Sequence, residues 1–203
     1  MTDDEAQVDR WADRYPAADI TAEEFEIFVT EILAAGEPGL DDFTVTLHET
    51  IEAADGAYDF DGTVRFRYLG MSFLVVVEAK RHSNAIKREL VQVLYAKAQS
   101  VSAQKAILIS TAPFQRGAIQ FAKIHGVALV KVTEGRFTFE TRAATEPAPL
   151  SRQEATEVYG IPPFVGVYIG RGAKPDSTMI AVVDAGDAKP VRGLLLGVAT
   201  TDG

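Results

Sequence analysis

The first regular pattern in the chain is an apolar stripe at helical spacing. Hydrophobic side chains recur every three or four residues across 25–33, which is the spacing of one buried helix face. Thr21 and Glu24 have the spacing of a capping box, in which each side chain bonds the backbone of the other residue. The breakers Gly36 and Pro38 follow the last apolar position. The pattern therefore predicts a helix that begins after Thr21 and ends before Gly36.

The next patterns have the two-residue period of β-strands. Residues 43–51 alternate between polar and apolar, and the turn-like residues 53–56 follow them. A second strand over 58–68 is expected to divide its side chains between two faces, with Phe60, Val64, Phe66 and Tyr68 on one and Asp59, Asp61, Arg65 and Arg67 on the other. After a turn at 69–71, residues 73–77 are continuously apolar, which is typical of a strand covered on both faces.

Helical and extended patterns alternate in the next part of the chain. Residues 86–101 have helical spacing and follow Ser83 and Asn84, two residue types that favour helix starts. A strand, a helix and a strand are then predicted at 106–109, 114–125 and 127–132. Strand–helix–strand units make right-handed crossovers between parallel strands, whereas the earlier meander is antiparallel. We therefore predict an α/β fold with a mixed β-sheet flanked by helices.

The composition changes after residue 142. Residues 143–150 are rich in alanine and proline and predict a linker. Beyond it, 151–203 predicts a small β-rich C-terminal extension of unknown role, with short strands at 165–169, 179–183 and 194–196. The main domain is expected to span 21–142, preceded by an acidic segment at 1–20.

Charge and cysteine content indicate where the protein is located and which partners it can bind. The chain has no cysteine and an acidic start unlike a signal peptide, so we expect a cytoplasmic protein without a membrane span. The net charge of −9 is unevenly distributed. Residues 1–61 carry 2 basic and 18 acidic side chains, whereas residues 62–142 carry 13 and 4. The basic middle segment can therefore meet a polyanion, although neutralisation between the two segments explains the pattern equally well.

Candidate chemistry gathers at the end of the apolar strand. Glu78 and Lys80 are two residues apart, so their side chains share one face with Cα atoms about 6.6 Å apart. Asp61, on the preceding strand, is expected to lie beside Glu78. Two adjacent carboxylates suit Mg²⁺, which can stabilise a developing negative charge and acidify a bound water during phosphodiester cleavage, with Lys80 orienting that water. A simple ion pair between Glu78 and Lys80 is the alternative interpretation.

Residues 21–132 also resemble the Mrr-like restriction endonucleases of the PD-(D/E)xK nuclease superfamily. The matching stretches are Phe25-Glu26, 58–61, 77–80 and 104–129, of which the last is the most specific. The resemblance implies a restriction-endonuclease-like mixed sheet and a metal-dependent DNA endonuclease, in restriction, defence or DNA processing. Phe60 stands where the superfamily's name-giving proline is expected.

The resemblance also implies roles for individual residues. Asp61 matches the metal-binding aspartate, Glu78 the second acidic ligand, Lys80 the catalytic lysine, and Glu26 the glutamate of the first helix. The cofactor would be Mg²⁺, with Mn²⁺ as a substitute. Side chains expected to contact nucleic acid follow the lysine: Arg81, His82, Lys87, Arg88 and Gln92. A solvated helix start explains these polar residues equally well.

Partners and alternatives complete the set of hypotheses. DNA is the expected substrate, and a homodimer would supply the two active sites of a double-strand cut. The C-terminal region shows no helix-turn-helix pattern, so a protein partner is one way to select targets. The main alternative is a catalytically silent module with the same fold that binds DNA or a protein. An RNA-directed nuclease is a weaker one.

Overall fold

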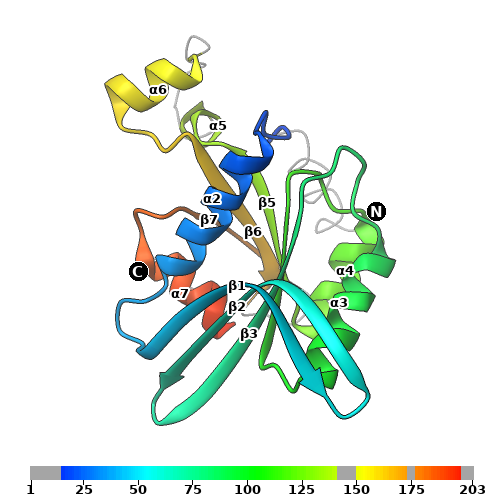
Figure 1. Ribbon diagram of the computed structural model, residues 1–203. Helices are drawn as coiled ribbons and strands as arrows, with labels where there is room; N and C mark the ends of the chain where they lie inside the picture. The colour runs from blue at the N-terminus through cyan, green and yellow to red at the C-terminus, as the bar shows by residue number, and fades with distance from the viewer. Residues whose placement is uncertain (1–14, 141–149, 173–176, 198–203) are drawn as a thin grey trace.

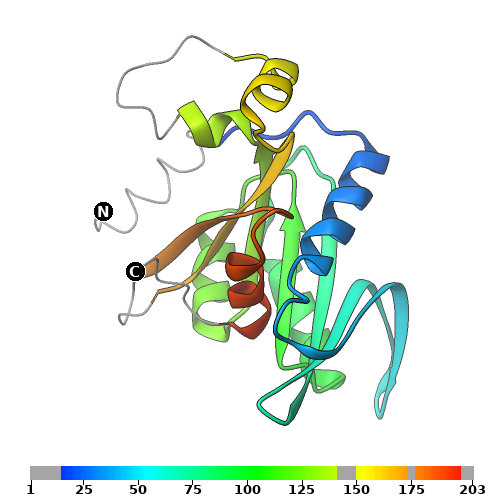
Figure 2. The same cartoon turned by 90° about the vertical axis from the view of Figure 1, so that its left-hand side faces the viewer.

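The computed structural model describes residues 15–140, 150–172 and 177–197 and contains a seven-stranded mixed sheet with helices on both faces (Figure 1, Figure 2). The strands are β1 Asp41–Ala53, β2 Gly56–Tyr68, β3 Met71–Lys80, β4 Lys105–Ser110, β5 Ala128–Glu134, β6 Phe164–Arg171 and β7 Thr178–Val183. The helices are α2 Ala22–Ala34, α3 Arg88–Ser100, α4 Arg116–His125, α5 Arg136–Glu140, α6 Arg152–Tyr159 and α7 Ala188–Leu196. The predicted α/β class is confirmed.

The order of strands in the sheet is the order in the chain. β1, β2 and β3 form an antiparallel meander, β3, β4 and β5 are parallel, and β6 and β7 continue antiparallel to β5. Both parallel connections move across the sheet in the same direction. Right-handed crossovers therefore place their helices, α3 and α4, on the same face.

Two hydrophobic cores lie on the two faces of the sheet. One core packs α2 and α7 against it, and the other packs α3 and α4. Figure 1 shows these helix pairs on opposite sides of the strands. β3 lies between the two cores, and its Val75, Val76 and Val77 are completely buried, as the apolar run predicted. Within the described ranges, no helix is both long and apolar enough to span a bilayer.

The first helix follows the predicted pattern closely. The Thr21 hydroxyl accepts from the Glu24 amide at 3.2 Å, and the Glu24 carboxylate accepts from the Thr21 amide at 2.8 Å, so the capping box is complete. The buried face of α2 is the predicted stripe, Phe25, Phe28, Val29, Ile32 and Leu33. This helix lies on the same face of the sheet as α7 (Figure 2).

The start and the buried face of α3 differ from the prediction. The helix begins at Arg88 with Lys87 at the cap position, so Ser83 and Asn84 are not its caps. Its buried residues are Val91, Leu94 and Ala98, whereas Leu90 and Val93 are exposed. Of the apolar residues that have helical spacing in the sequence, Leu94 is thus buried, but the face that packs against α4 and β4 is rotated toward small Ala98.

The prediction that Phe60 lies on the same face of β2 as Val64 and Phe66 is also wrong. Val64 and Phe66 pack in the core under α2, but Phe60 packs in the core under α3 and α4. The ladder between β2 and β3 reaches only the pair Gly62–Val77. Beyond that pair, β2 is paired with β1 alone, so the two parts of β2 have different neighbours and face different cores.

The C-terminal residues extend the same sheet. The strands predicted at 165–169 and 179–183 are present as β6 and β7, and α7 contributes to the core under α2. The strand predicted at 194–196 is wrong, because these leucines end helix α7. Asp187 caps its start and Gly197, with φ of 69°, ends it. Of the predicted linker, only Leu150 lies within the described residues, and the acidic segment is described only from Tyr15 onward.

Candidate active site

The site is built where β2 and β3 separate. After the last ladder pair, Gly62–Val77, Asp61 Oδ2 accepts a hydrogen bond from the Ala79 amide at 2.7 Å. The carboxylate thus satisfies a backbone donor of β3. This bond fixes Asp61 beside the last residues of β3.

Lys80 joins the two predicted acidic residues. Its Nζ lies 2.6 Å from Glu78 Oε1 and 3.6 Å from Asp61 Oδ2. The side chains are partly exposed, 17% for Glu78, 28% for Lys80 and 36% for Asp61, so the group is reachable from solvent. The structure therefore brings together the three residues that the sequence placed at the centre.

The surroundings of Lys80 favour its charged form. Burial disfavours the ammonium, but the hydrogen bond and charge of Glu78, with the charge of Asp61, outweigh this effect and raise the pKa of Lys80. As an ammonium, Lys80 can stabilise negative charge or orient a water.

A second lysine, Lys97, was not predicted as part of the site. It comes from α3, and its Nζ lies 3.6 Å from Glu78 Oε2 and donates to the Asp59 carbonyl at 3.1 Å. Glu78 is thus held between two ammonium groups. A signal was present, since Lys97 is three residues after buried Leu94, but the sequence does not show that this part of the helix lies against the end of β3.

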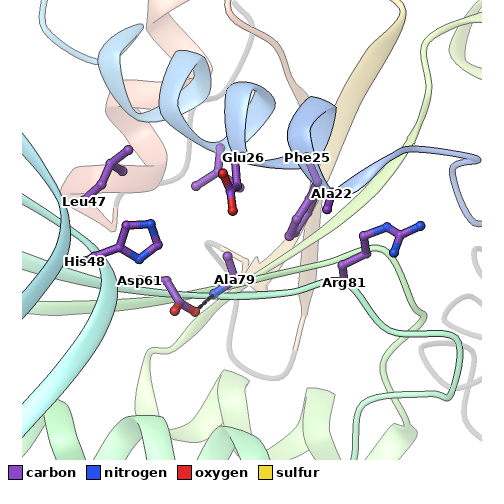
Figure 3. Close-up of a pocket in the computed structure, with 9 residues that line it drawn as sticks. Ala22, Phe25, Glu26, Leu47, His48, Asp61, Ala79 and Arg81 are labelled. Carbon is purple, nitrogen blue, oxygen red and sulfur yellow. Dashed lines mark hydrogen bonds between the residues drawn. The ribbon is translucent and has the colours of Figure 1, made fainter.

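A pocket of about 220 Å³ opens on the α2 side of Asp61 (Figure 3). Its walls combine apolar side chains of α2 and β1 with Glu26, His48, Asp61 and Arg81. Figure 3 shows Glu26 extending from α2 toward Asp61 in the middle of β2 and Ala79 near the end of β3. Glu26 therefore faces the same space as Asp61, as a shared site requires.

His48 is a second residue that the sequence analysis missed. It lies in β1 with φ of 51°, in the left-handed region, and its imidazole lines the pocket. Non-glycine residues adopt this conformation at a cost, and such residues concentrate at functional sites. The sequence carried no signal for this backbone conformation.

The residues expected to contact nucleic acid are all exposed and occupy the segment from the end of β3 into α3: Arg81, His82, Lys87, Arg88 and Gln92. Arg81 lines the pocket and donates from Nε to the Ile20 carbonyl at 2.9 Å. The Arg88 guanidinium lies 5.4 Å from the centre of the Phe121 ring on α4. Arg81 thus borders the candidate site, and the other four are available to solvent beyond it.

The donor set suits a hard divalent cation. Asp61 and Glu78 place carboxylate oxygens around one ammonium, and Mg²⁺ commonly takes one or two carboxylates and keeps several waters. No cluster of three or more histidine, cysteine, aspartate or glutamate side chains suitable for a metal occurs among the described residues. Asp61 and Glu78 are thus the two carboxylates here that could hold such an ion, with water as its other ligands.

Comparisons with known proteins connect the chain to a nuclease family. The family model Mrr_cat, described as "Restriction endonuclease", matches residues 17–134. No curated protein matches the chain. A solved structure described as "Crystal Structure of Protein of Unknown Function AF1548" is similar at 15% identity and a TM-score of 0.42, over 50% of this chain and 53% of that one. This chain therefore spans about half of that protein.

Proposed function

Since the chain belongs to the Mrr_cat restriction endonuclease family, as its sequence resemblance predicted, we propose that it is a metal-dependent endonuclease that hydrolyses phosphodiester bonds of DNA. One observation carries this proposal. Lys80 contacts both Glu78 and Asp61 at the point where β2 and β3 separate, next to an open pocket. A buried structural ion pair needs neither the second carboxylate nor the opening to solvent.

We assign the metal to Asp61 and Glu78. A bound Mg²⁺, or Mn²⁺ in its place, would neutralise charge on the phosphate and acidify a water. Lys80 orients that water and stabilises the negative charge that develops on the phosphate oxygens. Glu26 adds a further carboxylate across the pocket, where it can hold a water by hydrogen bonding.

DNA binding is assigned to the exposed polar segment after β3. Arg81 borders the pocket and can contact the phosphate next to the cleaved one, whereas His82, Lys87, Arg88 and Gln92 extend the contact along the backbone. Such contacts position DNA without reading its sequence. Selection of a target would then rest on a homodimer, on a protein partner or on DNA structure.

The test is cleavage of supercoiled plasmid, methylated and unmethylated, with Mg²⁺, Mn²⁺ or EDTA. We expect metal-dependent nicking or linearisation that disappears in Lys80→Ala. Arg67→Ala is the matched control. Arg67 lies near the C-terminal end of β2, away from Lys80, and its guanidinium forms an exposed ion pair with the Asp42 carboxylate at 3.5 Å. A parallel assay on RNA separates the two substrates.

One observation favours the catalytically silent alternative, a module that binds DNA or a protein. Each oxygen of Glu78 faces a lysine, so the carboxylate is neutralised without a metal. Equal inactivity of folded wild type and Lys80→Ala on every substrate, with no binding of Mn²⁺, would replace our proposal with this one.

A further inference from the structure

Lys97 has contacts that a solvated lysine on a helix flank does not need. It is 26% exposed, and its ammonium meets Glu78, the Asp59 carbonyl and, at 5.7 Å from the ring centre, Phe60. These groups come from β3 and β2, while Lys97 comes from α3. Ordering such a long side chain costs conformational entropy, so the contacts at its end must offset that cost.

We propose that Lys97 is a positioning residue that weakens metal binding at this site by holding one oxygen of Glu78 in competition with the metal. The proposal rests on the function proposed above, in which Glu78 is a metal ligand. In this proposal a residue of α3 sets the affinity for the metal, whereas Lys80 of β3 takes part in the chemistry.

The balance of charge explains the expected direction. The group contains two carboxylates, Asp61 and Glu78, and two ammonium groups, Lys80 and Lys97, so it is neutral as it stands. A divalent cation that enters a neutral group is repelled by both lysines. Without Lys97 the group carries a net negative charge, and Glu78 Oε2 loses an ion-pair partner that the metal would have to displace.

Position separates Lys97 from Lys80. Lys80 contacts both carboxylates from β3 itself. Of the two carboxylates, Lys97 contacts only Glu78, and it comes from the helix on the opposite side of the sheet from α2. The pocket is lined by Asp61 and Arg81, among others, and by none of Glu78, Lys80 and Lys97. Neutralising Lys97 therefore changes the charge felt by the metal and leaves the walls of the pocket intact.

The experiment is a titration of the full chain with Mn²⁺. Binding is measured by calorimetry and, independently, by the electron paramagnetic resonance signal of free Mn²⁺. We expect Lys97→Met and Lys97→Gln to bind Mn²⁺ on the order of tenfold more tightly than wild type. This is the size of effect expected when one positive charge is removed near an ion in a partly solvated site. Glutamine keeps a donor for the Asp59 carbonyl and provides a second neutral variant. Lys97→Arg retains the charge and should bind as wild type does.

Lys123→Met is the matched control. Lys123 is also partly buried and lies on the neighbouring helix α4, where its Nζ donates to Thr178 at 2.8 Å, far from Glu78 in the fold. Its replacement should leave the Mn²⁺ affinity unchanged. In a Glu78→Gln background, Lys97→Met should lose most of its effect, because the contact that carries the coupling is gone.

Failure of this inference and failure of the proposed function give different results. Wild-type binding that Asp61→Asn abolishes, combined with unchanged or weaker affinity in both neutral Lys97 variants, would overturn the role of Lys97 and leave the metal site standing. Absence of Mn²⁺ binding in folded wild type and in every variant would overturn both. Thermal unfolding of each variant establishes that it is folded.

Discussion

Two carboxylates near the ends of parallel strands each lie between two cations, but we expect them to have different roles. Glu78 lies near the end of β3 between Lys80 and Lys97, and Glu134 ends β5 between two arginines. Arg136 Nε lies 2.8 Å and an Arg152 nitrogen 3.2 Å from the Glu134 carboxylate. Each carboxylate therefore balances its charge against two cations at the same edge of one sheet.

The cations of Glu134 also join separate parts of the chain. Arg136 donates to the Leu150 carbonyl and Arg152 to the Asp19 carbonyl, each at 2.6 Å. The Glu134 side chain is only 8% exposed. Burial alone would raise its pKa, but the hydrogen bonds and charges of Arg152 and Arg136 outweigh this effect and lower the pKa of Glu134.

The difference lies in what else surrounds each carboxylate. Glu134 is enclosed by forked, fixed guanidinium groups that link the ends of the domain, which suits a structural role. Glu78 has two compact lysine ammonium groups and a second carboxylate nearby, that of Asp61, which lines a pocket. A cluster that lies open and carries an extra acid can exchange partners, so chemistry is expected at β3 and not at β5.

The largest expected effect separates the two sites by activity. Glu78→Gln should lower DNA cleavage by at least about a hundredfold, because it removes a charge that the site holds ready for the reaction. Its free energy of unfolding should change by less than about 1 kcal/mol, since the pairs it breaks are partly solvated. Plasmid cleavage and urea unfolding of the same preparation measure both quantities. Full cleavage by Glu78→Gln would remove Glu78 from the proposed centre.

The converse change tests the structural site. Glu134→Gln should lower the free energy of unfolding by about 2 kcal/mol, because it leaves two arginines without their carboxylate in a largely buried place. Arg136 and Arg152 are each about a third exposed, which keeps the effect below that of a fully buried pair. Urea unfolding measures the loss, and cleavage per folded molecule should remain that of wild type.

Acid pH provides the control for this effect. The lowered pKa of Glu134 means that its stabilisation is present above the ordinary glutamate pKa of about 4.3 and is lost as the pH falls through the folded-state pKa. Glutamine does not titrate. The difference in stability between wild type and Glu134→Gln should therefore shrink below about pH 4. A difference that stays constant with pH would show that packing, and not charge, accounts for the loss.

Local rules in the sequence predicted most of the elements that position the site. The capping box and apolar stripe gave α2, and the apolar run gave β3 with Glu78 and Lys80 on one face. The approach of Asp61 followed from the meander of neighbouring strands. These features depend on spacing within one element or between adjacent elements, which the sequence states directly.

Features that depend on distant packing were not predictable in this way. Lys97 reaches Glu78 only because α3 packs beside the end of β3, a placement that no spacing within the helix indicates. The leucines at 194–196 fit a strand or a helix, and the caps Asp187 and Gly197 decide in favour of a helix. Pairing of β5 with β6 joins segments separated by about 30 residues and leaves no local signal.

The smallest expected effect concerns His48, which has a left-handed φ of 51° and lines the pocket of the candidate active site. His48→Gly should raise the free energy of unfolding by about 0.5 to 1 kcal/mol, since glycine adopts this conformation without the steric cost. It should also lower cleavage, because the imidazole leaves the pocket wall. Leu69→Gly is the matched control, with the same φ of 51° in the exposed turn between β2 and β3. It should gain similar stability at full activity, so equal activity of the two variants would show that the strain at His48 serves the strand and not the site.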